Sequence, residues 1–271
     1  MKYQKDIGFA IIRSNTPIDK KLIKSFSIAL NKNKKFFNDN VKKKFNIVIC
    51  NNKIEWKKEC KYYHFPEACG TVLRNGDLII KSLQFMRNEI KEQYGALMKS
   101  SEEKPAGPSS KKWKESIENY QKRLGKWFKD SLNRTNYSSY QKSIDHEMNH
   151  VFWTLKYKTT KPIWMMEGLA SIIGLARRIS RKDLLKMIKQ KKMKSNILVY
   201  KYKKRDFTNT EKVYFNYLIW GYFILFITKN RPNKIIEFMD EYSKKVTLNN
   251  YNNLFVKFFG DTVKTKFEEF V

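Results

Sequence analysis

The sequence predicts an α+β protein in which a first lobe carries a small mixed or antiparallel sheet and a second lobe is helical. The run 45–50 is rich in β-branched and aromatic residues and ends at two asparagines, which is typical of a strand followed by a turn. Asn75-Gly76 lies between two β-prone runs and predicts a hairpin at 68–82. Beyond residue 139 the apolar residues recur at helical spacing, so the rest of the chain is expected to be helical.

The other elements of the first lobe follow from apolar spacing and from turn residues. Apolar positions over 22–30 predict a helix that packs on the 45–50 strand. The segments 83–99 and 113–132 look helical. Between them, 100–112 contains two prolines, one glycine and four serines, which predicts an exposed linker.

Six further helices are expected at 139–157, 162–177, 181–192, 211–229, 232–244 and 250–258. We assign 1–158 to an N-terminal α/β lobe that includes the 139–157 helix. We assign 159–271 to a C-terminal helical lobe. Within the first lobe, 83–140 is predicted to be an insertion.

Composition excludes several classes of protein. A hydrophobic content of 41% and an aromatic content of 15% exclude a wholly disordered chain. No run reaches the roughly 18 apolar residues of a membrane span, and the N-terminus lacks the long apolar region of a signal peptide, so we expect a cytoplasmic protein without a membrane partner. Cys50, Cys60 and Cys69 form no CxxC pair, which indicates free thiols.

The charge leaves one partner class open. The chain has 56 basic and 26 acidic residues, a formal net charge of +30. This excess would indicate nucleic acid or an anionic surface as a partner if the basic residues clustered into a stripe, and they do not cluster cleanly. Lysine supplies 46 of them and arginine 10, although arginine is the preferred reader of phosphates and bases. Nucleic acid is therefore a possible partner but not the favoured one.

The pattern His146-Glu147-x-x-His150 lies within the 139–157 helix. Residues four apart share one face of a helix, so the two imidazoles can bind one metal ion while Glu147 points at a water bound to it. Apolar residues give the helix a separate side that faces the core: Ile144, Met148, Val151, Phe152 and Leu155. The chain has only three histidines, and two of them lie in this pattern.

A zinc ion that keeps an open position for water needs a third protein ligand. Glu167 is the candidate because it is the one acid in an apolar run that follows Pro162. Burying an unpaired carboxylate is costly, and a shared metal ion would be its partner. Small residues keep this helix slim, which would let it approach the histidine helix closely: Gly168, Ala170, Gly174 and Ala176.

Two motifs together resemble a known family, His146-Glu147-x-x-His150 and Pro162-x-Trp164-x-x-Glu167-Gly-x-Ala170. They are similar to those of the gluzincin metallopeptidases, in particular the small peptidase-MA-like branch. The spacing from His150 to Glu167 is shorter than in the thermolysin type. The resemblance implies a gluzincin-like fold with a zinc cleft between the two lobes, and one Zn²⁺ per chain held by His146, His150 and Glu167.

The same resemblance implies a zinc-dependent metallopeptidase that hydrolyses peptide bonds in a peptide or protein substrate. Zinc would lower the pKa of its bound water to about 7, and Glu147 would take the proton as that water attacks the peptide carbonyl. The family stabilises the oxyanion with a tyrosine or histidine; here Tyr214 is the first candidate and Tyr217 the second. The edge of the 68–82 hairpin could bind the substrate as an added strand.

The sequence also departs from the family. Gluzincins often carry an acid one turn after the metal-binding glutamate, where this chain has Ser171, and Asp145 points the wrong way to replace it. The insertion 83–140 has no counterpart and could act as a lid or substrate guide. The alternative function, suggested by the charge, is a basic nucleic-acid-associated protein: either a protease acting on bound proteins or an inactive metallopeptidase homologue.

Overall fold

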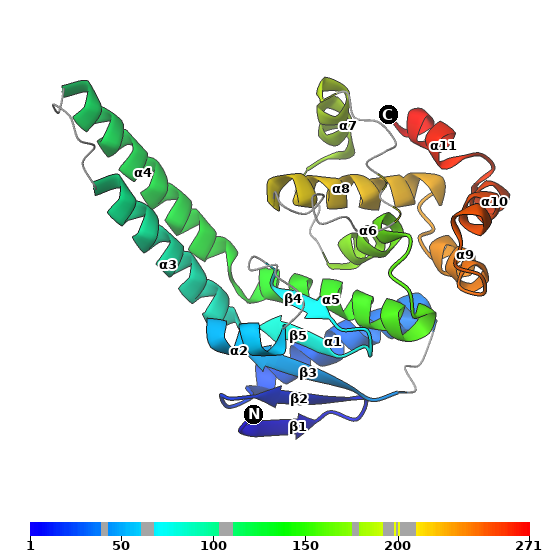
Figure 1. The fold of residues 1–271 in the computed structure, drawn as a ribbon, viewed down its shortest axis with the longest axis horizontal. Coiled ribbons are helices and arrows are strands. Elements are labelled where there is room, and N and C mark those ends of the chain that lie inside the picture. Colours follow the sequence, from blue (N-terminus) through cyan, green and yellow to red (C-terminus); the bar gives the residue numbers. More distant parts are fainter. Residues whose placement is uncertain are drawn as a thin grey trace.

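The computed structural model describes residues 1–38, 43–60, 68–102, 111–174, 179–191, 198, 200 and 210–271. Within these residues the chain forms eleven helices and one five-stranded mixed sheet, so the predicted combination of strands and helices is confirmed. In Figure 1 helix α5 (Tyr137–Tyr157) lies between the sheet and the helices of the C-terminal part of the chain.

The strands of the sheet are β1 (Tyr3–Asp6), β2 (Ala10–Ser14), β3 (Phe45–Cys50), β4 (Gly70–Val72) and β5 (Leu78–Lys81). Their order is β1-β2-β3-β5-β4, with β2, β3 and β5 parallel in the centre and the two outer strands antiparallel to their neighbours. The predicted 45–50 strand and 68–82 hairpin are confirmed as β3 and β4–β5. Gly76 in the turn has φ 89°, a conformation that glycine adopts readily and most other residues do not.

Helix α1 (Lys20–Phe37) connects β2 to β3, and the short helix α2 (Lys53–Glu59) follows β3. The Asp19 side chain caps α1 by accepting the backbone N–H of Leu22 at 3.3 Å. On its buried side α1 packs along α5 and shares the main hydrophobic core with β3. The predicted 22–30 helix is therefore confirmed, and it extends further in both directions than the apolar pattern indicates.

The C-terminal part of the chain is helical, as predicted. Its helices are α6 (Ile163–Gly174), α7 (Arg181–Gln190), α8 (Thr210–Ile227), α9 (Lys234–Tyr242), α10 (Leu248–Phe259) and α11 (Val263–Phe270). Helix α6 is apolar almost throughout and packs against both α5 and α8. The end predicted for the 162–177 helix lies outside the described residues. The division into lobes at 158/159 falls between α5 and α6 and stays a prediction.

Two long helices, α3 (Leu83–Glu102) and α4 (Lys111–Arg134), form an antiparallel pair that projects from the rest of the molecule (Figure 1). We call this pair the arm. The Tyr94 and Phe128 rings stack within it, with centroids 4.3 Å apart. The arm confirms the helices predicted on either side of the 100–112 linker.

The bounds predicted for the linker are wrong, because α3 continues through Glu102 and α4 already begins at Lys111. The Ser101 hydroxyl donates to the Met98 carbonyl at 2.7 Å and accepts a hydrogen bond from Gln121 of α4 at 3.1 Å. These contacts hold the last turn of α3 against α4. Residues 103–110 lie outside the described part of the chain.

Among the described residues, no helix is both long enough and apolar enough to cross a membrane.

Two glycines in helices should respond oppositely to alanine. A Cβ on Gly95 of α3 would meet nothing within 4 Å, so Gly95→Ala should stabilise the arm by about 1 kcal/mol through helix propensity. A Cβ on Gly174 of α6 would lie 2.5 Å from the backbone nitrogen of His146 and from the Lys142 carbonyl oxygen. Gly174→Ala should therefore lower the free energy of unfolding by about 1–3 kcal/mol.

Hydrogen exchange of the arm amides and urea unfolding of the whole chain measure the two effects. Slower exchange in α3 of Gly95→Ala is expected. Unchanged stability of Gly174→Ala would show that α5 and α6 are not in the close contact described.

Candidate metal centre

Helix α5 begins at a capping box that fixes its first turn. The Asn136 side chain accepts the Ser139 backbone N–H at 3.1 Å, and the Ser139 hydroxyl accepts the Asn136 backbone N–H at 3.0 Å. The predicted core-facing side is confirmed for the buried residues Ile144, Met148, Val151 and Phe152. The histidine pattern thus lies in the middle of a long, well-packed helix.

The two histidines and Glu167 converge on one point. The Nε2 atoms of His146 and His150 lie 3.1 Å apart, and Glu167 Oε2 lies 3.5 Å from the first and 3.2 Å from the second. All three side chains are buried, and their ligand atoms lie within 4.8 Å of one another. The structure therefore brings together the three residues predicted to bind a metal, and the group could hold a metal ion.

These distances suit a small divalent cation. Ligand atoms at about 2.0–2.1 Å from a tetrahedral ion lie about 3.3–3.4 Å from one another, close to the three distances observed. Burial by itself raises the pKa of Glu167, but the imidazoles of His150 and His146 outweigh this effect and hold the pKa well below its ordinary value. The Glu167 carboxyl is therefore an anion that faces two ring nitrogens. One carboxylate oxygen and two imidazole nitrogens together form a suitable donor set for a cation.

Glu147 lies beside this group, against strand β4. Burial raises its pKa from 4.5 to about 7, even though the charge of His146 acts in the other direction. A Cβ on Gly70 would lie 2.6 Å from Glu147 Cγ, so only glycine lets the strand approach this closely. The Cys69 thiol lies 3.9 Å from Glu147 Oε1. In the metal-free chain Glu147 is therefore buried from solvent and has a pKa suited to proton transfer near neutral pH.

Helix α6 is slim at the positions where its neighbours approach. Gly174 faces His146, as the small residues predicted. Gly168 instead faces α8, where an added Cβ would lie 2.7 Å from Ile224 Cδ1 and 3.0 Å from the Trp220 backbone. The small residues thus let α6 fit between two helices, whereas the sequence suggested only one. Ala176 lies outside the described residues.

Helix α8 brings a tyrosine to His146, His150 and Glu167, the three residues that we call the metal group. The Tyr217 ring stacks on the His146 ring, with centroids 5.9 Å apart and an interplanar angle of 23°. Burial, together with the charges of Glu167 and Glu147 and a side-chain hydrogen bond with Glu167, raises the Tyr217 pKa well above its ordinary value. The phenol therefore stays protonated. Tyr214, the first candidate, belongs to the same helix, but its side chain lies outside the described part of the structure.

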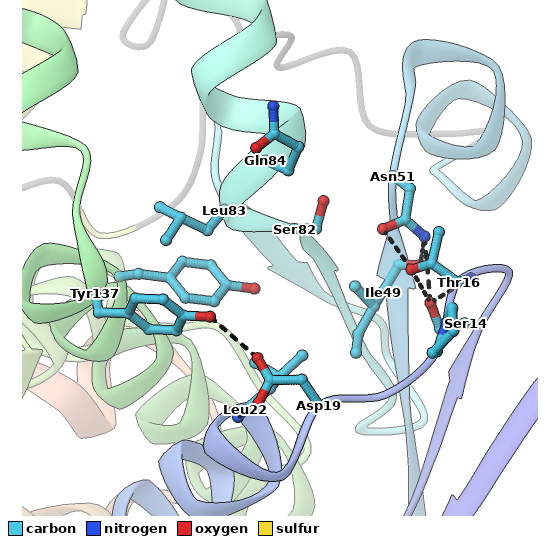
Figure 2. Close-up of a pocket in the computed structure, with 12 residues that line it drawn as sticks. Ser14, Thr16, Asp19, Leu22, Ile49, Asn51, Ser82, Leu83, Gln84 and Tyr137 are labelled. Atoms are coloured by element: carbon cyan, nitrogen blue, oxygen red, sulfur yellow. Dashed lines mark hydrogen bonds between the residues drawn. The ribbon is translucent and has the colours of Figure 1, made fainter.

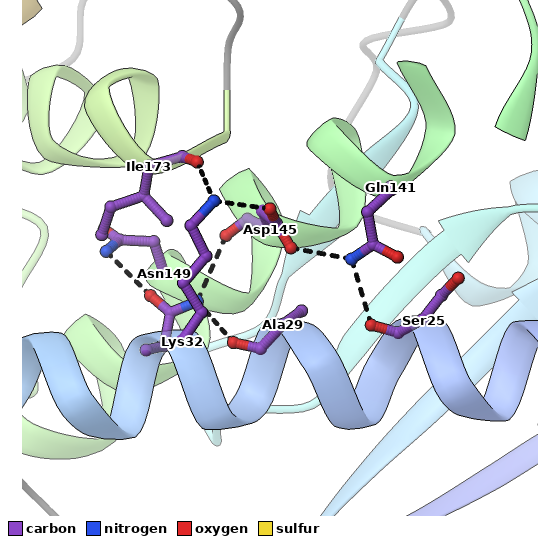
Figure 3. Close-up of polar contacts among 8 residues, drawn as sticks. Ser25, Ala29, Lys32, Gln141, Asp145, Asn149 and Ile173 are labelled. Carbon is purple, nitrogen blue, oxygen red and sulfur yellow. Dashed lines mark hydrogen bonds and ion pairs between the residues drawn. The ribbon is translucent and has the colours of Figure 1, made fainter. Parts of the chain in front are cut away.

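The residues beside the ligands have other partners (Figure 3). Asp145 accepts hydrogen bonds from Lys32 Nζ at 2.7 Å and Gln141 Nε2 at 2.8 Å, so it does point away from His146. Lys32 also donates to the Ile173 carbonyl and thereby connects α1, α5 and α6. The Ser171 hydroxyl donates to the Glu167 carbonyl at 2.7 Å, not to a histidine. Within the described residues, the Nδ1 atoms of both histidines have no hydrogen-bond partner.

A buried pair of asparagines fixes α5 against α1. Asn149 Nδ2 donates to Asn33 Oδ1 at 3.1 Å, and Asn33 Nδ2 donates to the Ala29 carbonyl at 2.9 Å and to the Asp145 carbonyl at 3.4 Å (Figure 3). Both side chains are fully buried. Because Asn149 immediately precedes His150, this pair orients the face of α5 that carries the histidines. Sequence analysis missed Lys32 and Asn33, since both lie in the distant helix α1.

A cavity of about 420 Å³ lies at the carboxyl ends of β2, β3 and β5, and none of its lining residues belongs to the metal group (Figure 2). Tyr137 and Tyr140 line it from the first turns of α5. The Tyr137 hydroxyl donates to Asp19 at 3.0 Å, and the Tyr140 hydroxyl donates to the Lys81 carbonyl at 2.8 Å. These bonds attach the start of α5 to α1 and to β5.

No protein-family model, curated protein or solved structure matches the chain. Its function must therefore be inferred from the residues of the metal group and their surroundings.

The raised pKa of Glu147 predicts a pH-dependent stability difference between metal-free wild type and metal-free Glu147→Gln. The unfolded chain ionises Glu147 above pH 4.5, whereas the folded chain resists until about pH 7. The folded wild type is therefore at its most stable below pH 4.5, the pKa of Glu147 in the unfolded chain. This contribution is lost as the pH rises through about 7, the pKa of Glu147 in the folded chain. At about 1.4 kcal/mol per pKa unit, the free energy of unfolding of the variant should rise by on the order of 3 kcal/mol relative to wild type as the pH goes from the lower pKa to the higher one.

Urea unfolding of both proteins between about pH 4.5 and pH 8 measures this difference. A difference that stays constant with pH would contradict the burial of an ionisable Glu147.

Proposed function

We propose that the chain is a zinc-dependent metallopeptidase of the gluzincin type. The observation that carries the proposal is the convergence of His146, His150 and Glu167 on one buried point, with Glu147 on the same helix as the histidines. Two imidazoles and one carboxylate suit zinc, and three protein ligands are the usual number in catalytic zinc sites, whereas structural sites have four. Zinc bound there would supply Lewis acidity toward a water and a peptide carbonyl.

Glu147 is the general base of the proposed reaction. Its carboxylate is buried beside the histidines, where it would take a proton from the attacking water and return it to the leaving amine. The close approach of Gly70 holds the side chain in place and excludes solvent on that side. A buried carboxylate beside the three ligands, and not one of them, has no evident role in a site that only stores a metal ion.

Tyr217 is the oxyanion candidate whose side chain the structure describes. Its ring packs on the ring of His146, and its protonated hydroxyl lies within hydrogen-bonding reach of Glu167. A phenol in this position can donate a hydrogen bond to an oxygen that becomes negatively charged beside the ligands.

The substrate is proposed to be a peptide or protein that binds along β4. This strand lies at one end of the sheet order, and its first residue, Gly70, contacts Glu147. A peptide added to the outer edge of β4 would form backbone hydrogen bonds and pass close to the general base. Binding of this kind depends mainly on the backbone, so we expect weak dependence on substrate sequence.

Elemental analysis of protein purified without chelator, combined with cleavage of a peptide library, tests the proposal. About one zinc per chain and cleavage that stops on chelation are expected. Stoichiometric zinc without cleavage of any peptide would favour an inactive homologue. Absence of bound zinc would reject the proposed site.

Two conservative substitutions should separate the base from the ligand. Glu147→Gln should retain zinc and lose about 10²–10⁴-fold in kcat, because the amide cannot accept a proton. Glu167→Gln should weaken zinc binding itself, because it removes the anionic ligand. Zinc titration and steady-state kinetics measure both, and equal zinc affinity in the two variants would show that Glu167 is not a ligand.

Two tyrosine substitutions decide between the oxyanion candidates. Tyr217→Phe should lower kcat by about 10²–10³-fold while zinc content and KM change little. Tyr214→Phe is the matched control on the same helix and should stay close to wild type. A larger loss in Tyr214→Phe would make Tyr214 the donor.

A further inference from the structure

We propose that the outer face of the arm binds the phosphate backbone of nucleic acid. This face consists of Lys122, Lys126 and Lys129 on α4, with Arg123 and Arg134 at its margin. The inference concerns a surface of the arm and does not depend on the metal group.

The three lysines lie on one side of α4. They follow the spacing i, i+4 and i+7, which places them on a single helix face. The opposite face packs on α3 through buried Leu124 and through Phe128, which stacks on Tyr94. All five basic residues of the outer face are exposed. The face therefore presents a row of positive charges directed away from the partner helix.

These charges are not neutralised within the described structure. None of the five basic residues forms an ion pair with another described residue. Of the three α3 acids, Glu89 and Glu92 are paired with Lys81 and Lys53, and Glu102 is the last residue of the helix, at the tip. On α4, the exposed Glu115 and Glu118 share the face of the lysines but lie nearer the tip, Asp130 is half-buried, and no acid occurs from 119 to 129.

The arm is also placed to meet a large partner. It projects from the body in Figure 1, and among its described side chains only Phe85 and Leu124 are buried. It contributes little to the core, so core packing does not explain two helices of this length. Helices α3 and α4 leave the fold between β5 and α5, and α5 carries Glu147.

Nucleic acid fits this face better than an acidic protein does. Protein interfaces are depleted in lysine and rely on buried aromatic and aliphatic anchors, and the row contains no apolar side chain. Phosphate contacts require only positive charge and no anchor. At about 1.5 Å per residue, Lys122 to Arg134 covers about 18 Å, a length over which a duplex presents about ten phosphates.

The test compares two triple variants with the same loss of charge. One is Lys122→Gln, Lys126→Gln and Lys129→Gln on the arm, where glutamine preserves helix propensity. The matched control is Lys20→Gln, Lys24→Gln and Lys35→Gln, three exposed lysines of α1 that are likewise in no ion pair with a described residue. Filter binding of a mixed-sequence 20-base-pair duplex is measured with the full chain between about 50 and 200 mM salt.

The arm variant should bind at least about tenfold more weakly, and the slope of log affinity against log salt should fall by about 2.7, as expected for three lost phosphate contacts. The control should stay within about twofold of wild type. Equal losses in the two variants would show that the affinity comes from the overall charge of +30 and would overturn the proposal. Displacement of the duplex by poly-glutamate at equal charge would overturn it in favour of an acidic protein. Circular dichroism confirms that both variants remain folded, and no readout requires hydrolysis.

Discussion

Two imidazoles and two carboxylates are buried next to one another on α5 and α6. Their burial constrains how the surrounding helices and strand can pack. Each of these side chains is at most 8% exposed. Ionised groups removed from water cost several kcal/mol unless they are paired. Glu167 is paired with the histidines, and Glu147 is accommodated by a raised pKa. Three helices and one strand must therefore meet at fixed distances, and glycines at three of the contacts make this possible: Gly70, Gly168 and Gly174.

The chemistry of the site could be predicted from the sequence because it depends on local spacing. Helical periodicity alone places His146 and His150 on a shared face with Glu147 next to it, and an isolated acid in the apolar run identifies Glu167. The β4–β5 hairpin was predictable for the same reason, since its turn is encoded by two adjacent residues. Each of these features is encoded by residues that lie close together in the sequence, and tertiary packing contributes little to it.

The side chains that hold α5 in place and the tyrosine beside His146 could not be predicted, because they come from remote parts of the chain. Lys32 and Asn33 reach α5 from a helix more than a hundred positions earlier, and nothing in their local sequence indicates an inward role. The choice of Tyr217 at the metal group depends on how α8 packs across α6. The linker bounds failed because a tertiary contact between Ser101 and Gln121 outweighed weak helix propensity.

The geometry at the base of the arm makes the rest of the fold independent of the length of the arm. An antiparallel helix pair returns the chain to the place where it left, so the arm separates β5 from α5 in sequence without separating them in space. The hydrogen bond from Tyr140 to the Lys81 carbonyl joins the two junctions directly. Closure entropy grows only slowly with loop length, so a longer, shorter or absent arm would leave the junction nearly unchanged. The length of the arm is therefore free to vary without moving the residues that could hold the metal ion.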